Sequence, residues 1–210
     1  METITREGWD KIFQEITTLM EDNKDLLTDI DAKFGDGDHG TTISKIAKVV
    51  SGISTEWVAT DAPLKKLFAE IGDAVTNISG GSAGPLYGTY LGGYGEELED
   101  EVEADAALLK KILGSGLTEL QYLSKAKVGD KTMMDTLIPG TNAALDSADD
   151  IVAIVTNAKE AAIKGAKESE NYVSKFGRAR TYGEQTIGTP DAGAQSCTYI
   201  FIGFYNALTK

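Results

Sequence analysis

The chain has little cysteine, little histidine and no long apolar run. Its single cysteine, Cys197, excludes an internal disulfide framework and is typical of a reducing compartment. The amino terminus lacks a basic region followed by an apolar stretch, and no later segment is apolar over the roughly 20 residues that a bilayer span requires. We therefore expect a cytoplasmic protein that does not enter a membrane.

Positive charge is also scarce. Lysine and arginine together number 20 against 33 aspartates and glutamates, which gives a formal net charge of −13. A field of this sign repels nucleic acid and anionic lipid, so we expect neither as a partner. A polyanionic ligand would need attractive groups in its immediate surroundings to overcome this repulsion.

Two-residue alternation bounded by turn signals is absent as well, which argues against a substantial β-sheet. Apolar residues instead recur at three- and four-residue steps, the stripe of an amphipathic helix. The stripes are Trp9, Ile12, Phe13, Ile16 and Leu19; Ile43, Ile46, Ala47 and Val50; and Leu64, Leu67, Phe68, Ile71 and Val75. Further helices are predicted over about residues 83–98, 105–125, 132–147, 150–170 and 194–208. The pattern predicts an all-α fold of about eight helices in one domain, residues 1–210.

Glycine, by contrast, is abundant and clustered, at 23 of 210 residues, about 11% against roughly 7% in average proteins. Gly84, Gly88 and Gly92 lie four residues apart, so on a helix they share a face that a neighbouring backbone can approach closely. The segment before them, residues 79–85, would leave free amides at a helix start, which suits an anion. The residues alone leave both interpretations open.

The densest chemical signal is the acidic loop, residues 31–40, which read DAKFGDGDHG. Glycines between the carboxylates let the chain fold back, so that Asp31, Asp36 and Asp38 can converge on a hard cation that prefers oxygen ligands. The same residues could instead cap helices and form Asx-turns, because aspartate is an ordinary loop residue. Residue type alone does not decide between these two roles.

Three familiar motifs nearly match the acidic loop, and each fails. The spacing Gly35-x-Gly37-x-x-Gly40 follows a helix, whereas the dinucleotide fingerprint follows a strand. A phosphate-binding P-loop would need lysine where Thr41 stands. An EF-hand starting at Asp36 would need glycine in place of Thr41 and glutamate in place of Ala47.

A charge estimate narrows what the acidic loop could bind. A bare carboxylate about 4 Å from a phosphate oxygen costs roughly 4 kcal/mol at an effective dielectric near 20, so the loop repels phosphate unless a cation intervenes. Two divalent ions against three aspartates leave a net charge of about +1, and magnesium characteristically joins carboxylates to substrate phosphates. Other candidate phosphate contacts lie in residues 129–132, 177–180 and 190–193, although salt bridges and turns explain each one equally well.

Together, these motifs resemble the family of nucleotide-binding L subunits of dihydroxyacetone kinase and the homologous domain of the ATP-dependent single-chain kinases. Five ordered blocks carry the resemblance over nearly the whole chain. They are residues 35–40 (GDGDHG), 80–88 (GGSAGPLYG), 129–133 (GDKTM), 177–179 (GRA) and 182–193 (YGEQTIGTPDAG). The resemblance implies a barrel of eight antiparallel amphipathic helices with a nucleotide at one end.

The resemblance also implies a role for individual residues. Asp31, Asp36 and Asp38 match the three aspartates that hold two Mg²⁺ ions, which in turn bind the phosphates of the nucleotide. The expected nucleotide-binding residues are His39, Gly40, Thr41, Thr42, Ser82, Ala83, Thr132, Met133, Arg178, Asp191 and Gly193. Phosphoryl transfer requires placement and charge stabilisation, so Arg178 is also the candidate catalytic residue, acting on the charge of the moving group.

In the phosphotransferase-dependent branch, the resemblance implies that ADP is a resident cofactor that cycles to ATP. A phosphohistidine on a partner M subunit recharges it, and the phosphoryl group then moves to dihydroxyacetone held by a separate K subunit. A chain of this length without a ketone-binding domain favours that branch. The alternatives are a domain of an ATP-dependent relative, a non-catalytic nucleotide-sensing module, and a phosphocarrier role for His39. A homodimer is a further possibility.

Overall fold

The computed structural model describes residues 2–79 and 81–210. In this part of the chain nine α-helices form, and they are joined by short 3-10 segments and loops. The α-helices are α1 (Arg6–Asp22), α2 (Lys24–Asp31), α3 (His39–Val58), α4 (Leu64–Thr76), α5 (Ala83–Gly92), α6 (Ala106–Leu123), α7 (Met134–Leu145), α8 (Ile151–Glu168) and α9 (Ala192–Thr209). The 3-10 helices are η1 (Gly93–Gly95), η2 (Ser169–Asn171) and η3 (Ala179–Thr186).

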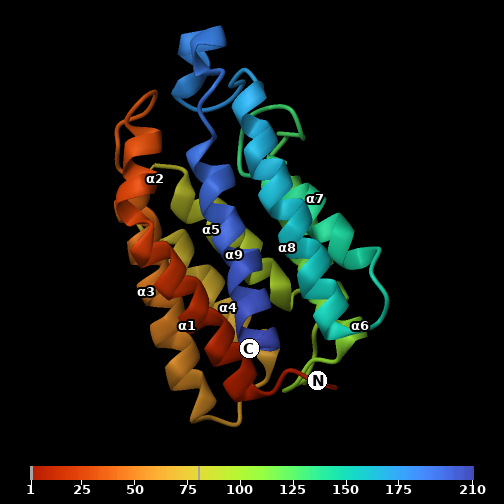
Figure 1. Cartoon of the computed structure of the whole chain (residues 1–210). Coiled ribbons are helices and arrows are strands. Elements are labelled where there is room, and N and C mark those ends of the chain that lie inside the picture. The colour runs from red at the N-terminus through yellow and green to blue at the C-terminus, as the bar shows by residue number, and fades with distance from the viewer. Residues whose placement is uncertain (1, 80) are drawn as a thin grey trace.

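Eight of the helices form a closed ring. Following the chain, each of α1, α3, α4, α5, α6, α7, α8 and α9 packs against the next, and α9 returns to pack against α1 (Figure 1). Short connections make consecutive helices antiparallel, so α3, α5, α7 and α9 all begin at the same end of the barrel. The predicted all-α barrel of eight antiparallel helices is confirmed.

The ninth helix, α2, was not predicted. The chain leaves α1 at Asn23, whose side chain donates to the Leu19 carbonyl at 2.8 Å, and it begins a new helix at once. In this short helix only Leu27 and Ile30 are buried, too few to produce a recognisable stripe.

Aspartates and a threonine cap the starts of several helices. The side chains of Thr5, Asp105 and Asp150 each accept a hydrogen bond from an amide in the first turn of α1, α6 and α8. Such caps satisfy donors that the helix leaves unpaired.

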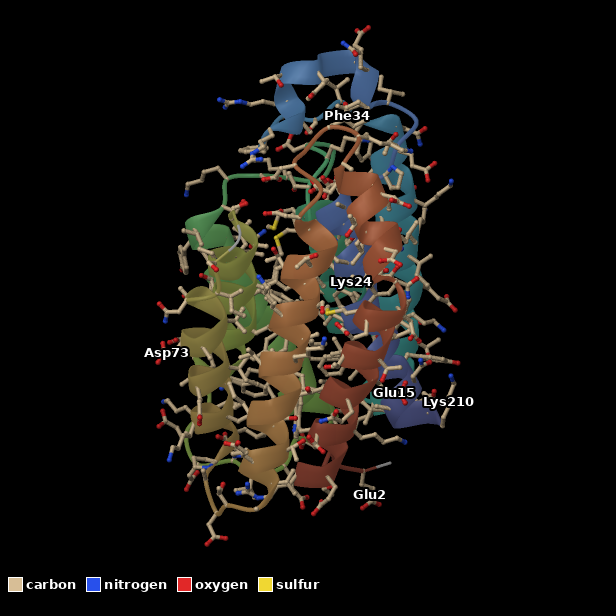
Figure 2. All side chains as sticks on the ribbon, turned by 90° about the vertical axis from the view of Figure 1, so that its left-hand side faces the viewer. Glu2, Glu15, Lys24, Phe34, Asp73 and Lys210 are labelled. Carbon is tan, nitrogen blue, oxygen red and sulfur yellow. The ribbon has the colours of Figure 1, made fainter. Side chains whose placement is uncertain are left out.

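The barrel interior is filled by the apolar stripes predicted from the sequence. The Trp9 ring meets the rings of Phe68 and Phe204 edge-on, with centroids 5.2 and 5.8 Å apart. Both geometries are favourable for aromatic pairs. Figure 2 shows polar side chains, including Glu15 and Asp73, on the outside of the bundle. No helix in the described residues is apolar enough over a sufficient length to cross a membrane.

The glycine stripe of α5 allows α4 to pack closely. A Cβ atom on Gly88 would lie 2.6 Å from the Thr76 amide nitrogen, and one on Gly92 would lie 3.1 Å from the Gly72 Cα. At Gly84 the obstacle would be the Ile78 carbonyl at 2.6 Å. The interpretation of this stripe as a close backbone approach is confirmed.

Candidate functional site

A cavity of about 310 Å³ opens at the end of the barrel where α3, α5, α7 and α9 begin. The first residues of these helices, or the residues just before them, line it: His39, Ser82, Ala83, Thr132, Met133, Ala192 and Gly193. A helix start carries unpaired amides and a partial positive charge. Four such starts around one cavity make it suited to an anion.

The three aspartates of the acidic loop lie on one wall of this cavity. Each offers one oxygen, and the three oxygens lie within 4.8 Å of one another. Asp31 also accepts hydrogen bonds at Oδ2 from the amides of Asp38 and His39, at 3.1 and 3.4 Å, and so caps α3. The three carboxylates therefore converge, and one of them also caps α3, so the two arrangements that the sequence left as alternatives occur together.

Two glycines permit this convergence. Gly37 has a φ of +72°, a left-handed conformation that glycine adopts without a steric penalty. A Cβ atom on Gly35 would clash with the Asp31 carboxylate. The resulting oxygen-rich cluster fits a hard divalent cation, because such ions prefer carboxylate ligands.

A segment that we call the strap, residues 172–190, covers the open end of the barrel (Figure 1). It contacts the acidic loop twice. The Arg178 guanidinium forms an ion pair with the Asp36 carboxylate, and the Tyr182 ring lies 5.3 Å from the Phe34 ring, centroid to centroid. Figure 2 places Phe34 at this end of the molecule. The strap and the acidic loop therefore form adjoining walls of the cavity.

A buried polar chain ties three of the helix starts together. The Ser196 hydroxyl in α9 lies 2.8 Å from His39 Nε2 in α3 and 2.7 Å from the Tyr87 hydroxyl in α5. Burial lowers the pKa of His39 below its usual value, although Asp31 and Asp38 act in the opposite direction. Sequence reasoning did not identify Tyr87 or Ser196, because their contacts join residues more than 100 positions apart.

Asp191, at the start of α9, has a raised pKa. Asp191 Oδ2 accepts from the Ala194 amide at 2.8 Å and so caps the helix. Burial raises the pKa of Asp191 from 3.8 to about 7, with Asp135 adding to the shift and Lys131 opposing it. Asp135, which is fully buried, accepts from the amides of Gly129 and Thr132, both at 2.6 Å.

Most of the expected site residues line the cavity, and three do not. Those that line it are Asp31, Asp36, Asp38, His39, Ser82, Ala83, Thr132, Met133, Arg178, Asp191 and Gly193. Gly40 is buried and faces α2, Thr42 is only 3% exposed, and Thr41 faces solvent. A nucleotide contact at these three positions stays a prediction. Gly80, part of the predicted anion-binding segment, lies outside the described residues.

The model of the family described as "DAK2 domain" matches residues 33–206, which is most of the chain and includes every expected site residue except Asp31. The chain belongs to the DAK2 family.

Within the DAK2 family, two similar relatives are ADP-binding subunits DhaL of the dihydroxyacetone kinases of Listeria innocua. The subunit of PEP-dependent kinase 1 is 34% identical over 87% of this chain and 86% of its own length. The subunit of PEP-dependent kinase 2 is 30% identical over 88% and 87%.

A solved structure extends the comparison. The crystal structure of the C. freundii dihydroxyacetone kinase in its native form matches with a TM-score of 0.72 and 28% identity over 94% of this chain. The same kinase in complex with AMP-PNP and Mg²⁺ matches with a TM-score of 0.67 and 26% identity. This DAK2 chain spans about a third of that kinase chain, with 34% and 33% covered in the two structures.

Proposed function

We propose that this chain is the ADP- and magnesium-binding subunit of a phosphoenolpyruvate-dependent dihydroxyacetone kinase. One observation carries the proposal: three carboxylates lie within 4.8 Å of one another on the wall of a cavity into which four helix starts point. Helix starts attract a polyphosphate, while carboxylates repel it unless a cation lies between them. A nucleotide with magnesium suits both groups, because its phosphates would face the helix starts and the cation would lie between the phosphates and the carboxylates.

In this proposal Asp31, Asp36 and Asp38 hold two magnesium ions. Bound magnesium would neutralise phosphate charge and orient the terminal phosphate. His39, Ser82, Ala83, Thr132, Met133, Asp191 and Gly193 would surround the nucleotide, because they line the same cavity. Arg178 would stabilise charge on the transferred group, because it lies on the strap at the open end of the cavity.

The reaction needs two further proteins. We infer that a phosphohistidine of an M subunit transfers its phosphoryl group to the resident ADP, which gives ATP and free histidine. The group then passes to a hydroxyl of dihydroxyacetone held by a K subunit, and ADP is restored. The similarity to DhaL subunits over most of their length favours this route over that of an ATP-dependent single-chain kinase.

Mass spectrometry of the small molecules that the purified protein carries tests the proposal. Protein prepared without added nucleotide should release close to one ADP per chain on denaturation, because a resident cofactor survives purification. The same preparation, mixed with K and M subunits, phosphoenolpyruvate and the general phosphotransferase proteins, should produce dihydroxyacetone phosphate. A chain that retains ADP but supports no product would instead be a nucleotide-sensing module, and a chain without ADP would contradict the resident-cofactor proposal.

A further inference from the structure

Lys131 is a buried cation with an uncommon backbone conformation. The residue is 4% exposed, and its φ of +60° makes it the only non-glycine among the described residues in the left-handed region. Such a conformation costs free energy and persists only where the surroundings enforce it. Asp135 supplies the constraint, because its carboxylate binds the amides of Gly129 and Thr132 on either side of Lys131.

The Lys131 ammonium joins three segments of the cavity wall. It donates to the carbonyl of Ser169, just after α8, and to the carbonyl of Thr189, just before α9, both at 2.5 Å. Ser169 in turn accepts at Oγ from the Asp191 amide at 3.0 Å. Thr132 and Met133, which immediately precede α7, therefore have a fixed position relative to Asp191, which caps α9.

Acidic side chains surround Lys131. Burial lowers the pKa of Lys131, but the carboxylates of Asp191, Asp135 and Glu170 oppose that shift. A charged donor between two backbone carbonyls makes a stronger contact than a neutral one. Removing it would deprive the Thr189 carbonyl of its donor in a buried place, while the Ser169 carbonyl would keep only the Tyr172 amide at 3.2 Å.

We propose that Lys131 is a positioning residue, which holds the starts of α7 and α9 at the spacing that lets both contact the phosphates of one nucleotide. This inference rests on the proposed function, because it assigns the phosphates to these helix starts. Lys131 acts through the backbone of its neighbours and takes no part in the chemical step.

The first test uses hydrogen exchange of the ADP-free protein. In Lys131→Met, the amides of Asp191 and Ala194 should exchange at least tenfold faster than in wild type, because the turn before α9 loses its tie. Lys175→Met is the matched control. Lys175, in the strap, pairs at 2.7 Å with Asp130, the neighbour of Lys131, but the Lys175 side chain is 60% exposed. Exchange in the control should stay within twofold of wild type, and equal acceleration in both variants would overturn the proposal.

The second test measures binding of ADP and adenosine in the presence of magnesium by calorimetry. Lys131→Met should weaken ADP at least tenfold and adenosine less than twofold, because the lost spacing concerns phosphates. Equal weakening of both ligands would indicate a general defect and overturn the inference. If wild-type protein itself fails to bind ADP, the proposed function fails, and the exchange measurement still tests whether Lys131 ties the turn before α9 to the start of α7.

A glycine variant separates the side chain from the backbone. Lys131→Gly suits a φ of +60° and lacks the ammonium. It should show the same loss of ADP affinity as Lys131→Met, and it tests the proposal if the methionine variant does not fold. Wild-type ADP affinity in Lys131→Gly would overturn the proposal, because it would assign the role of this position to the backbone alone.

Discussion

The Arg178 guanidinium pairs with the Asp36 carboxylate, and this contact joins the strap to the acidic loop. Both residues were expected to serve the site, one as a catalytic cation and one as a magnesium ligand. The Arg178 side chain is 67% exposed, and exposed ion pairs contribute only about 0–1 kcal/mol. A divalent ion bound by several carboxylates would therefore displace the arginine, which could then face a phosphate.

Arg178→Gln should lower the rate of dihydroxyacetone phosphate formation in the reconstituted system about 100-fold or more, because charge stabilisation in the transition state is lost. Magnesium affinity of the nucleotide-free protein should stay the same or rise slightly, because a competitor for Asp36 is removed. Calorimetry and a coupled assay measure the two effects. Arg180→Gln, an exposed arginine two residues along the chain, makes the same change in net charge and should leave the rate within twofold. An unchanged rate in Arg178→Gln would remove Arg178 from the mechanism.

Asp36→Asn should abolish the stabilisation that ADP and magnesium give to the folded protein. A ligand at about 100 times its dissociation constant stabilises by about 2.7 kcal/mol, which for a chain of this size is about 5–10 °C in melting temperature. Thermal melting with and without ADP and magnesium measures this difference. Asp61→Asn, an exposed carboxylate in the loop after α3, should keep the full ligand-induced shift. If Asp36→Asn also keeps it, the assignment of this metal ligand is wrong.

The helices could be predicted from the sequence because their stripes are local, whereas their arrangement as a barrel was implied by the family resemblance. Trp9 to Leu19 or Leu64 to Val75 record a buried face within one helix, and such a pattern needs no knowledge of the partner helix. The α2 helix and the strap were not predicted. α2 buries too few apolar residues to form a stripe, and the strap is held by contacts such as Arg178 to Asp36, which link distant residues.

The candidate site likewise contains residues that could be predicted from the sequence and residues that could not. The acidic loop could be predicted because its three aspartates lie within eight residues and glycines let them converge. Lys131 could not be assigned its role, because the carbonyls that it binds are 38 and 58 positions away. Gly40 illustrates a third case: its motif pointed to a nucleotide contact, while the structure places it against α2.

Gly40→Ala should destabilise the fold by about 1–3 kcal/mol, because overpacking a tight contact forces the backbone to shift. Its Cβ atom would clash with the Lys24 carbonyl and the Thr28 hydroxyl of α2. Gly52 lies on the same helix with nothing within 4 Å of a Cβ atom, so Gly52→Ala should stabilise by about 0.4–1 kcal/mol. Urea unfolding of the two variants gives both values. Equal effects would contradict the close approach of α2 and α3.

Asp191 should make the stability of the ADP-free protein depend on pH. Its pKa is raised by burial from 3.8 to about 7, so between about pH 4 and 7 the folded state keeps a proton that the unfolded state releases. The contribution of this group to the free energy of unfolding is therefore greatest below pH 4 and is lost as the pH rises towards 7. Asp191→Asn stays neutral and can still accept from the Ala194 amide, so its stability should fall less over this window. Urea unfolding from pH 4 to 8 without magnesium measures the difference between the two curves. Asp105→Asn makes the same change at the exposed cap of α6 and controls for the substitution itself. Parallel curves for wild type and Asp191→Asn would show that Asp191 is not the group responsible for the pH dependence of stability.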